Sequence, residues 1–191
     1  MDWKKTLIEM GYLINTLIEE NMIYYNKEDV KLDWLGYEGA SDNEINRKEK
    51  SLGIFLPESY KKFLKISNGF RQISPFSGNL QPVSSINWLK FVSADFVQMH
   101  DESEDINVPD DKYFDYSENQ RTEFYRAKYL KESIAISEWV DGSIILLNPM
   151  VQYGDECEAW IYANWYPGAR RFRSFADLMM YELNWLRQKI D

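Results

Sequence analysis

The sequence contains few of the residues that build most reactive centres. Among 191 residues there is one cysteine, Cys157, and one histidine, His100. A single cysteine excludes a disulfide within the chain and favours a reducing compartment. A zinc site needs three or four His or Cys ligands, and a nucleophilic triad needs a histidine. We therefore interpret His100 as a surface residue and predict a protein that is not an enzyme and binds no metal.

Long apolar runs are also missing. Residues 1–20 contain no uninterrupted apolar stretch of the kind that a signal peptide has. The tight apolar run at 144–147 is far too short to span a bilayer. The nine glycines are scattered, and neither phosphate-binding signature occurs. We expect a cytoplasmic protein with no cofactor and no membrane contact.

Basic residues are in the minority. The chain has 22 Lys and Arg against 31 Asp and Glu, a formal net charge of −9. This charge opposes nucleic-acid binding, which needs cations against phosphates, and suits a basic protein partner. Nine acidic residues and one base, Lys112, lie between residues 95 and 118. Such a run is ordinarily a solvated loop, and this one lacks the glycine and the spacing of an EF-hand.

The periodicity of the apolar residues predicts an α+β fold, an antiparallel β-sheet meander flanked by helices. Helices are expected at 3–25, 41–52, 57–67, 94–100 and 175–189, and strands at 133–137, 143–147, 158–163 and 170–172. Ser41 and Glu44 form a capping-box pattern, and Asp141-Gly142 is a hairpin signal. We predict an N-terminal helical extension, residues 1–40, packed on a domain formed by residues 41–191.

The stretch from 49 to 69 has a series of shape-determining residues. A glycine suits the end of one helix, and a proline suits the first turn of the next. Two aromatic residues follow on one helix face, and Asn-Gly, which tolerates the left-handed conformation, ends the helix. These structural positions are Gly53, Pro57, Tyr60, Phe63, Asn68 and Gly69.

This series resembles the SUKH superfamily, which includes the yeast cell-wall regulator after which it is named. A second region, Leu146-Leu147-Asn148-Pro149 to Pro167-Gly168-Ala169-Arg170-Arg171, is similar as well, so the resemblance covers residues 41–186. It implies a sheet flanked by helices and no shared catalytic residues. Bacterial members are typically immunity proteins that neutralise a secreted polymorphic toxin, often a nuclease. Eukaryotic relatives act in signalling and protein interaction.

The acidic run is the predicted binding surface for a basic toxin, because it imitates a polyanion. The candidate partner-binding acids are Asp101, Glu102, Glu104, Asp105, Asp110 and Asp111. An interface also needs a buried anchor, for which aromatic residues are favoured; the candidates are Tyr113, Phe114 and Trp165. Two alternatives stay open at this stage, an intracellular scaffold or regulatory module without a toxin, and an enzyme that uses carboxylates alone. The oligomeric state is not indicated.

Overall fold

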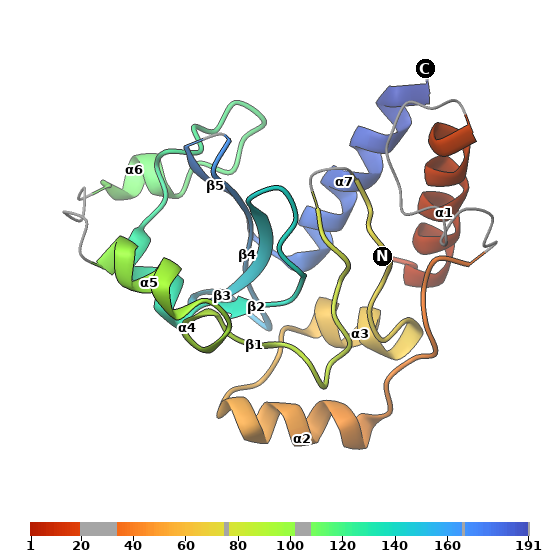
Figure 1. Ribbon diagram of the computed structural model, residues 1–191, viewed down its shortest axis with the longest axis horizontal. Coiled ribbons are helices and arrows are strands. Elements are labelled where there is room, and N and C mark those ends of the chain that lie inside the picture. Colours follow the sequence, from red (N-terminus) through yellow and green to blue (C-terminus); the bar gives the residue numbers. More distant parts are fainter. Residues whose placement is uncertain (20–33, 75–76, 102–107, 166, 191) are drawn as a thin grey trace.

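The computed structural model describes residues 1–19, 34–74, 77–101, 108–165 and 167–190 (Figure 1). In chain order, its elements are α1 (Trp3–Glu19), α2 (Asp42–Leu52), α3 (Glu58–Ile66), β1 (Asn87–Trp88), α4 (Leu89–Val92), α5 (Ala94–Asp101), α6 (Asp110–Tyr113), the 3₁₀ helix η1 (Ala127–Glu132), β2 (Ile134–Ala135), β3 (Ser143–Tyr153), β4 (Glu156–Ala163), β5 (Gly168–Phe172) and α7 (Phe175–Ile190). Within these ranges, no helix combines the length and the apolar character that a membrane crossing requires.

The five strands form one antiparallel sheet in the order β1-β2-β3-β4-β5, which confirms the predicted meander and the α+β class. Asp141 and Gly142 both have positive φ, 45° and 72°, as a tight hairpin turn before β3 requires. The prediction that Asn148-Pro149 ends this strand is wrong. β3 continues to Tyr153, and the register against β4 shifts between Asn148 and Gln152, so an irregularity accommodates the proline.

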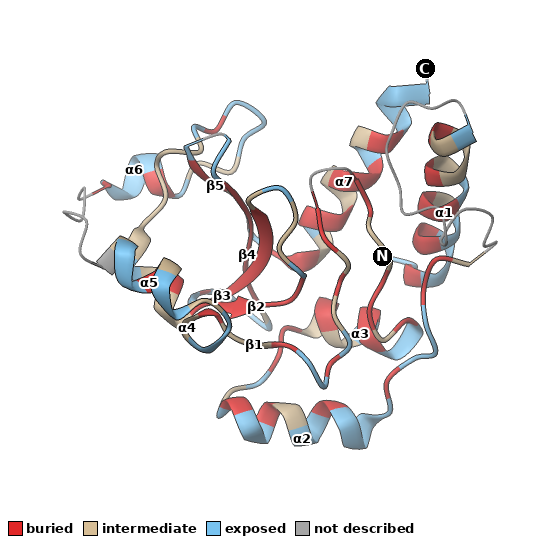
Figure 2. Ribbon diagram, in the orientation of Figure 1, coloured by how far each residue is buried: buried red, intermediate tan, exposed pale blue. Residues whose placement is uncertain are grey.

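The sheet separates two apolar cores, because both of its faces are covered. Ile145, Leu147 and Ile161 face the larger core, to which α1, α2, α3 and α7 contribute. The alternate residues, Leu146 and Trp160 among them, face a smaller core with side chains from α4, α5, α6 and η1. β4 and the first half of β3, residues 143–148, are therefore buried on both faces (Figure 2). This arrangement explains why residues 144–147 are all apolar.

α1 is part of the larger core. Its residues Leu7, Met10 and Ile14 are fully buried at helical spacing. The ring of Trp3 stacks on that of Phe175 in α7, with centroids 5.5 Å apart. The predicted continuation of this helix to residue 25 falls in 20–33, outside the described residues.

The stretch from 49 to 69 has the predicted design with two differences. Gly53 ends α2 with φ 74°, and both Tyr60 and Phe63 are fully buried. Pro57 is the N-cap of α3 and not a residue of its first turn. α3 ends at Ile66, before Asn68, whose φ is not positive. The Asn68 side chain instead accepts the backbone N–H of Val83 at 2.7 Å, and only the glycine that follows it has positive φ.

Candidate functional site

The acidic run is divided between α5 and α6. Asp101 is the last residue of α5, whereas the predicted site residues Glu102, Glu104 and Asp105 lie outside the described residues. Asp110 and Asp111, in the first turn of α6, are exposed. Asp110 forms an ion pair with Arg126, which reduces the charge that this turn presents.

The three candidate anchors have different environments. Phe114 and Trp165 are exposed and offer apolar surface to a partner. Tyr113 is fully buried in the smaller core, so the prediction that its side chain contacts a partner is corrected. Its hydroxyl donates a hydrogen bond of 2.5 Å to Glu158, which gives it an internal role.

Glu158 is the centre of a buried polar network beneath α6. Its carboxylate accepts hydrogen bonds from four side chains, Tyr113 (2.5 Å), Tyr116 (2.8 Å), Asn148 (2.8 Å) and Trp160 (2.7 Å). Burial, followed by the charge of Glu158, raises the pKa of Tyr113, so this hydroxyl stays protonated and donates. The network ties the tyrosines on either side of Phe114 to the sheet. From the sequence alone, Glu158 is predicted only as the first residue of a strand.

A larger surface feature is a groove of about 820 Å³ between the α2–α3 connection and the second half of β3. Most of its lining is apolar: Ile54, Phe55, Leu56, Pro57, Trp88, Ile134, Leu147, Pro149, Met150 and Cys157. Phe55 is 86% exposed and Met150 is 56% exposed, so two large apolar side chains of the lining face solvent. Exposed apolar residues that gather around a groove are typical of interaction sites.

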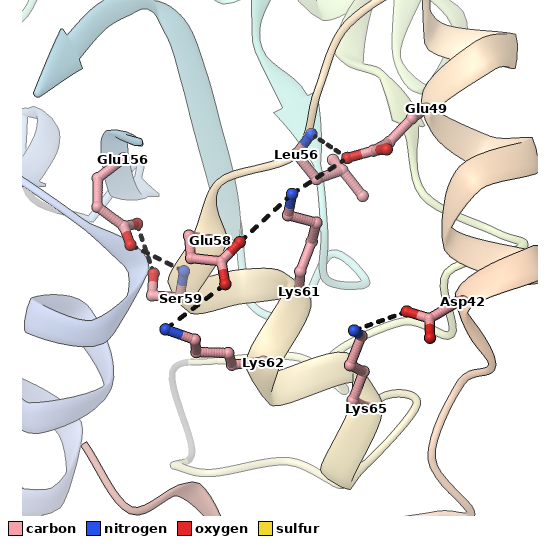
Figure 3. A network of polar contacts seen from close by, with 9 residues as sticks. All are labelled: Asp42, Glu49, Leu56, Glu58, Ser59, Lys61, Lys62, Lys65 and Glu156. Atoms are coloured by element: carbon pink, nitrogen blue, oxygen red, sulfur yellow. Dashed lines mark hydrogen bonds and ion pairs between the residues drawn. The ribbon is translucent and has the colours of Figure 1, made fainter. Parts of the chain in front are cut away.

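The β3–β4 turn forms one wall of the groove and is clamped to α3 (Figure 3). The Glu156 carboxylate accepts both the backbone N–H of Ser59, at 2.8 Å, and its hydroxyl, at 2.6 Å. Pro57 has no side-chain cap to offer, so this distant glutamate satisfies the start of the helix. The N–H of Glu58 donates to the carbonyl of Asp155 at 3.0 Å. The turn and the helix therefore hold one another in place.

The α2–α3 connection is fixed from the other side. The buried carboxylate of Glu49 accepts the N–H of Leu56 at 2.8 Å. The Lys61 ammonium lies 3.8 Å from Glu49 and 3.4 Å from Glu58 (Figure 3). These contacts hold the backbone on either side of Phe55, which leaves the Phe55 ring pre-positioned at the surface.

The charged residues of the groove are mostly acidic. Among the described lining residues, Glu58, Glu132, Asp155 and Glu156 stand against one base, Lys61, a difference of three negative charges. Lys90 pairs with Glu132 at 3.3 Å and offsets one of them. An apolar floor with an acidic rim complements a partner that carries apolar and cationic side chains.

The edge of β3 beside the groove is poorly suited to pairing with an added strand. Pro149 has no N–H, and the N–H of Met150 donates to the side chain of Asn148 at 3.1 Å. The carbonyl of Pro149 accepts from the side chain of Gln152 at 3.3 Å. Because these backbone groups are occupied or absent, the groove favours recognition by side chains over strand addition.

The groove has no local signature in the sequence, because its walls are far apart in the chain. Asp155 and Glu156 lie just before the strand predicted at 158–163, and nothing next to them in the chain indicates their contact with α3. One local signal was available: Phe55 lies in a loop between a helix-ending glycine and a helix-starting proline, where neither helical face can bury it. In the part of the chain that the structure describes, no cluster of three or more His, Cys, Asp or Glu side chains is arranged to hold a metal ion.

A comparison with protein families assigns the chain. No curated protein is significantly similar to the chain. The SMI1 / KNR4 family (SUKH-1) matches residues 39–180, a region that includes α2, α3, the whole sheet and the groove. This match covers well over half of the sequence. The chain therefore belongs to the SMI1 / KNR4 family (SUKH-1).

Proposed function

We propose that this protein is an immunity protein that binds a basic bacterial toxin and neutralises it by steric and electrostatic occlusion. Family membership supports the proposal, since bacterial relatives of this kind are typically immunity proteins. The observation that carries it is the groove, in which the exposed Phe55 and Met150 stand beside an acidic rim. A nuclease is the toxin class that fits best, because its active site must hold phosphates with cationic side chains.

Charge and apolar contact have separate roles in this proposal. Acidic side chains of the groove and of the 95–118 run attract a cationic toxin and raise the association rate. Phe55 supplies the buried anchor, because a large ring that leaves water at the centre of an interface contributes most to affinity. The rigid support of residues 54–57 lowers the entropy lost on binding. The bound protein then covers the cleft that the nucleic acid would enter.

The first experiment tests the groove. The toxin candidate is the variable C-terminal domain of a secreted protein encoded by the neighbouring reading frame. We expect co-expression with this protein to protect a bacterial host from that domain, and the purified pair to bind in calorimetry. The double variant Phe55→Asp/Met150→Asp should weaken binding by about 100-fold or more and abolish protection, because it places charge at the apolar centre.

The matched control is Tyr12→Asp on α1, which replaces an aromatic residue that is 70% exposed and lies outside the groove. It should leave the affinity within about twofold. Equal loss in both variants, or none in the groove variant, would contradict the assignment of the groove. A neighbourhood without such a toxin would favour the alternative, an intracellular scaffold or regulatory module.

The second experiment tests the acidic run. Reversal of Asp101, Glu102 and Glu104 to lysine should lower the association rate by roughly tenfold at low salt and have little effect at high salt, where charges are screened. Unchanged association kinetics at low salt would remove this run from the proposed interface.

A further inference from the structure

A second pocket, of about 400 Å³, lies between α7 and strands β4 and β5. It is lined by Ser74, Thr122, Ile161, Trp165, Arg170, Tyr181, Glu182 and Trp185. None of these residues lines the groove described above. Of the described lining residues, Trp165 is exposed, with 50% of its surface accessible. It therefore lies where the pocket opens to solvent. The pocket is within the size range of small-ligand sites and has three aromatic walls.

Glu182 is the unusual member of this lining. It occupies a core-facing position of α7, only 5% exposed, and it has no hydrogen bond or ion pair with any described residue. A carboxyl group in such a place is costly, because an ionised carboxylate loses its hydration and gains nothing in return. Burial alone raises the pKa of Glu182 to about 7. The fold therefore keeps a titratable acid facing a pocket where an apolar residue would be more stable.

The cations already present near the pocket do not satisfy this carboxyl group. The Arg170 guanidinium stacks over the Tyr181 ring at 4.5 Å and donates to the carbonyl of Glu118 at 2.9 Å. The Lys189 ammonium lies 5.4 Å over the ring of Trp185. Neither charge is among the causes of the Glu182 shift. Aromatic rings of the lining thus already hold cations of the chain, whereas no described cation contributes to the pKa shift of Glu182.

We infer that this pocket receives the guanidinium group of an arginine side chain from the protein partner, held by the Glu182 carboxylate and the face of Trp165. A planar guanidinium can donate two N–H bonds to one carboxylate and stack on an indole at the same time. It is also less strongly hydrated than an ammonium, so it enters a buried site at lower cost. The arrangement of Arg170 over Tyr181 shows that a guanidinium fits against these walls. The source of the arginine rests on the proposed function, since a basic toxin supplies it.

The test uses N-ethylguanidinium chloride, an arginine side-chain analogue, with the full ¹⁵N-labelled chain at pH 8. The indole N–H signals of the seven tryptophans are followed by NMR, against an equal concentration of sodium chloride. We expect saturable shifts confined to Trp165 and Trp185, with a dissociation constant in the millimolar range, as a fragment of this size allows. Glu182→Gln should weaken binding at least about tenfold, because it removes the charged acceptor.

Two controls separate the site from a general charge effect. Glu19→Gln, at an exposed position of α1, makes the same change in charge and should not alter the titration. Trp165→Ala, at the exposed side where folding is little affected, should weaken binding severalfold. At pH 5.5 binding should be about 30-fold weaker than at pH 8, the ratio of ionised fractions of a group with a pKa of about 7. The other described charged or titratable groups of the lining are Arg170 and Tyr181.

Shifts that persist in Glu182→Gln, or the lack of saturable shifts in the wild-type chain, would overturn the inference. The outcome is independent of the test of the groove. If the analogue fails to bind while the toxin still binds at Phe55, the pocket inference fails and the proposed function stands. If the analogue binds as expected and no toxin is neutralised, the pocket accepts a guanidinium group and the assignment of its source to a toxin fails.

Discussion

Replacement of Glu158 by alanine is expected to be among the most destabilising single changes in this protein. The residue is fully buried, and its carboxylate accepts hydrogen bonds from the side chains of Tyr113, Tyr116, Asn148 and Trp160. Arg171, also fully buried, is a cation whose charge Glu158 partly balances. Alanine would leave these donors without an acceptor in a place that water reaches poorly.

The expected decrease in the free energy of unfolding follows from the number of hydrogen bonds lost. A hydrogen bond to a charged group contributes about 1.5 kcal/mol or more, so four set a scale of about 6 kcal/mol. Tyr116 is only half-buried, so its hydroxyl can form a hydrogen bond with water in the variant. That bond recovers part of the lost free energy. We expect Glu158→Ala to lower the free energy of unfolding by about 4 kcal/mol, comparable to the loss of one partner of a buried ion pair. Glu158→Gln keeps one acceptor oxygen and should cost about 2 kcal/mol.

Urea unfolding followed by tryptophan fluorescence measures these differences, and the indole N–H signal of Trp160 reports its own hydrogen bond. Glu118→Ala is the matched control, because it removes an exposed glutamate whose side chain makes no hydrogen bond with a described residue. The control should change the free energy of unfolding by less than about 0.5 kcal/mol. A cost below about 1 kcal/mol for Glu158→Ala would show that the network does not hold the smaller core together.

Three further predictions concern the larger core and the α2–α3 connection. Because the pKa of Glu182 is raised to about 7, the native state binds more protons than the unfolded chain between pH 5 and 7, so the free energy of unfolding should fall by roughly 3 kcal/mol as pH rises from 5 to 8. Glu182→Gln should remove this decrease in urea titrations at both pH values. Met10→Ala should cost about 3 kcal/mol in the same assay, because α1 is fully buried at this residue. Gly53→Ala should cost about 1 kcal/mol through its φ of 74° alone, since a Cβ there would meet nothing within 4 Å.

The features that could be predicted from the sequence are those whose partners lie close together in the chain. Ser41 and Glu44 form both hydrogen bonds of a capping box across three residues, so their pattern was sufficient. The hairpin at Asp141-Gly142 depends on the backbone freedom of two adjacent residues. The spacing of apolar residues predicts α7 and the central strands for the same reason. Residues on one face of a helix or strand recur every few positions, so the pattern is visible within a short segment.

The features that were missed depend on contacts between distant residues. β1 has only two residues and exists because Asn87 pairs with Ala135, so no local pattern marks it. The Glu156 cap of Ser59 spans 97 positions, and the groove wall that it supports is equally non-local. The sequence predicts Tyr113 as a candidate interface anchor because aromatic residues are favoured in that role. Its ring is buried in the smaller core, and its hydroxyl donates to Glu158, which lies 45 residues away.

The buried network also bears on how the acidic surface is presented. Tyr113 and Tyr116 flank Phe114 and Asp115 in the chain, and both hydroxyls are bound to the same carboxylate in the sheet. An exposed ring can serve as an interface anchor only when its backbone is held, because the entropy of ordering it would otherwise be lost on binding. The charge buried at Glu158 therefore has a consequence at the surface, where it fixes the segment that carries Phe114. An apolar residue in place of Glu158 would accept neither hydrogen bond, so both tyrosine hydroxyls would lose their attachment to β4.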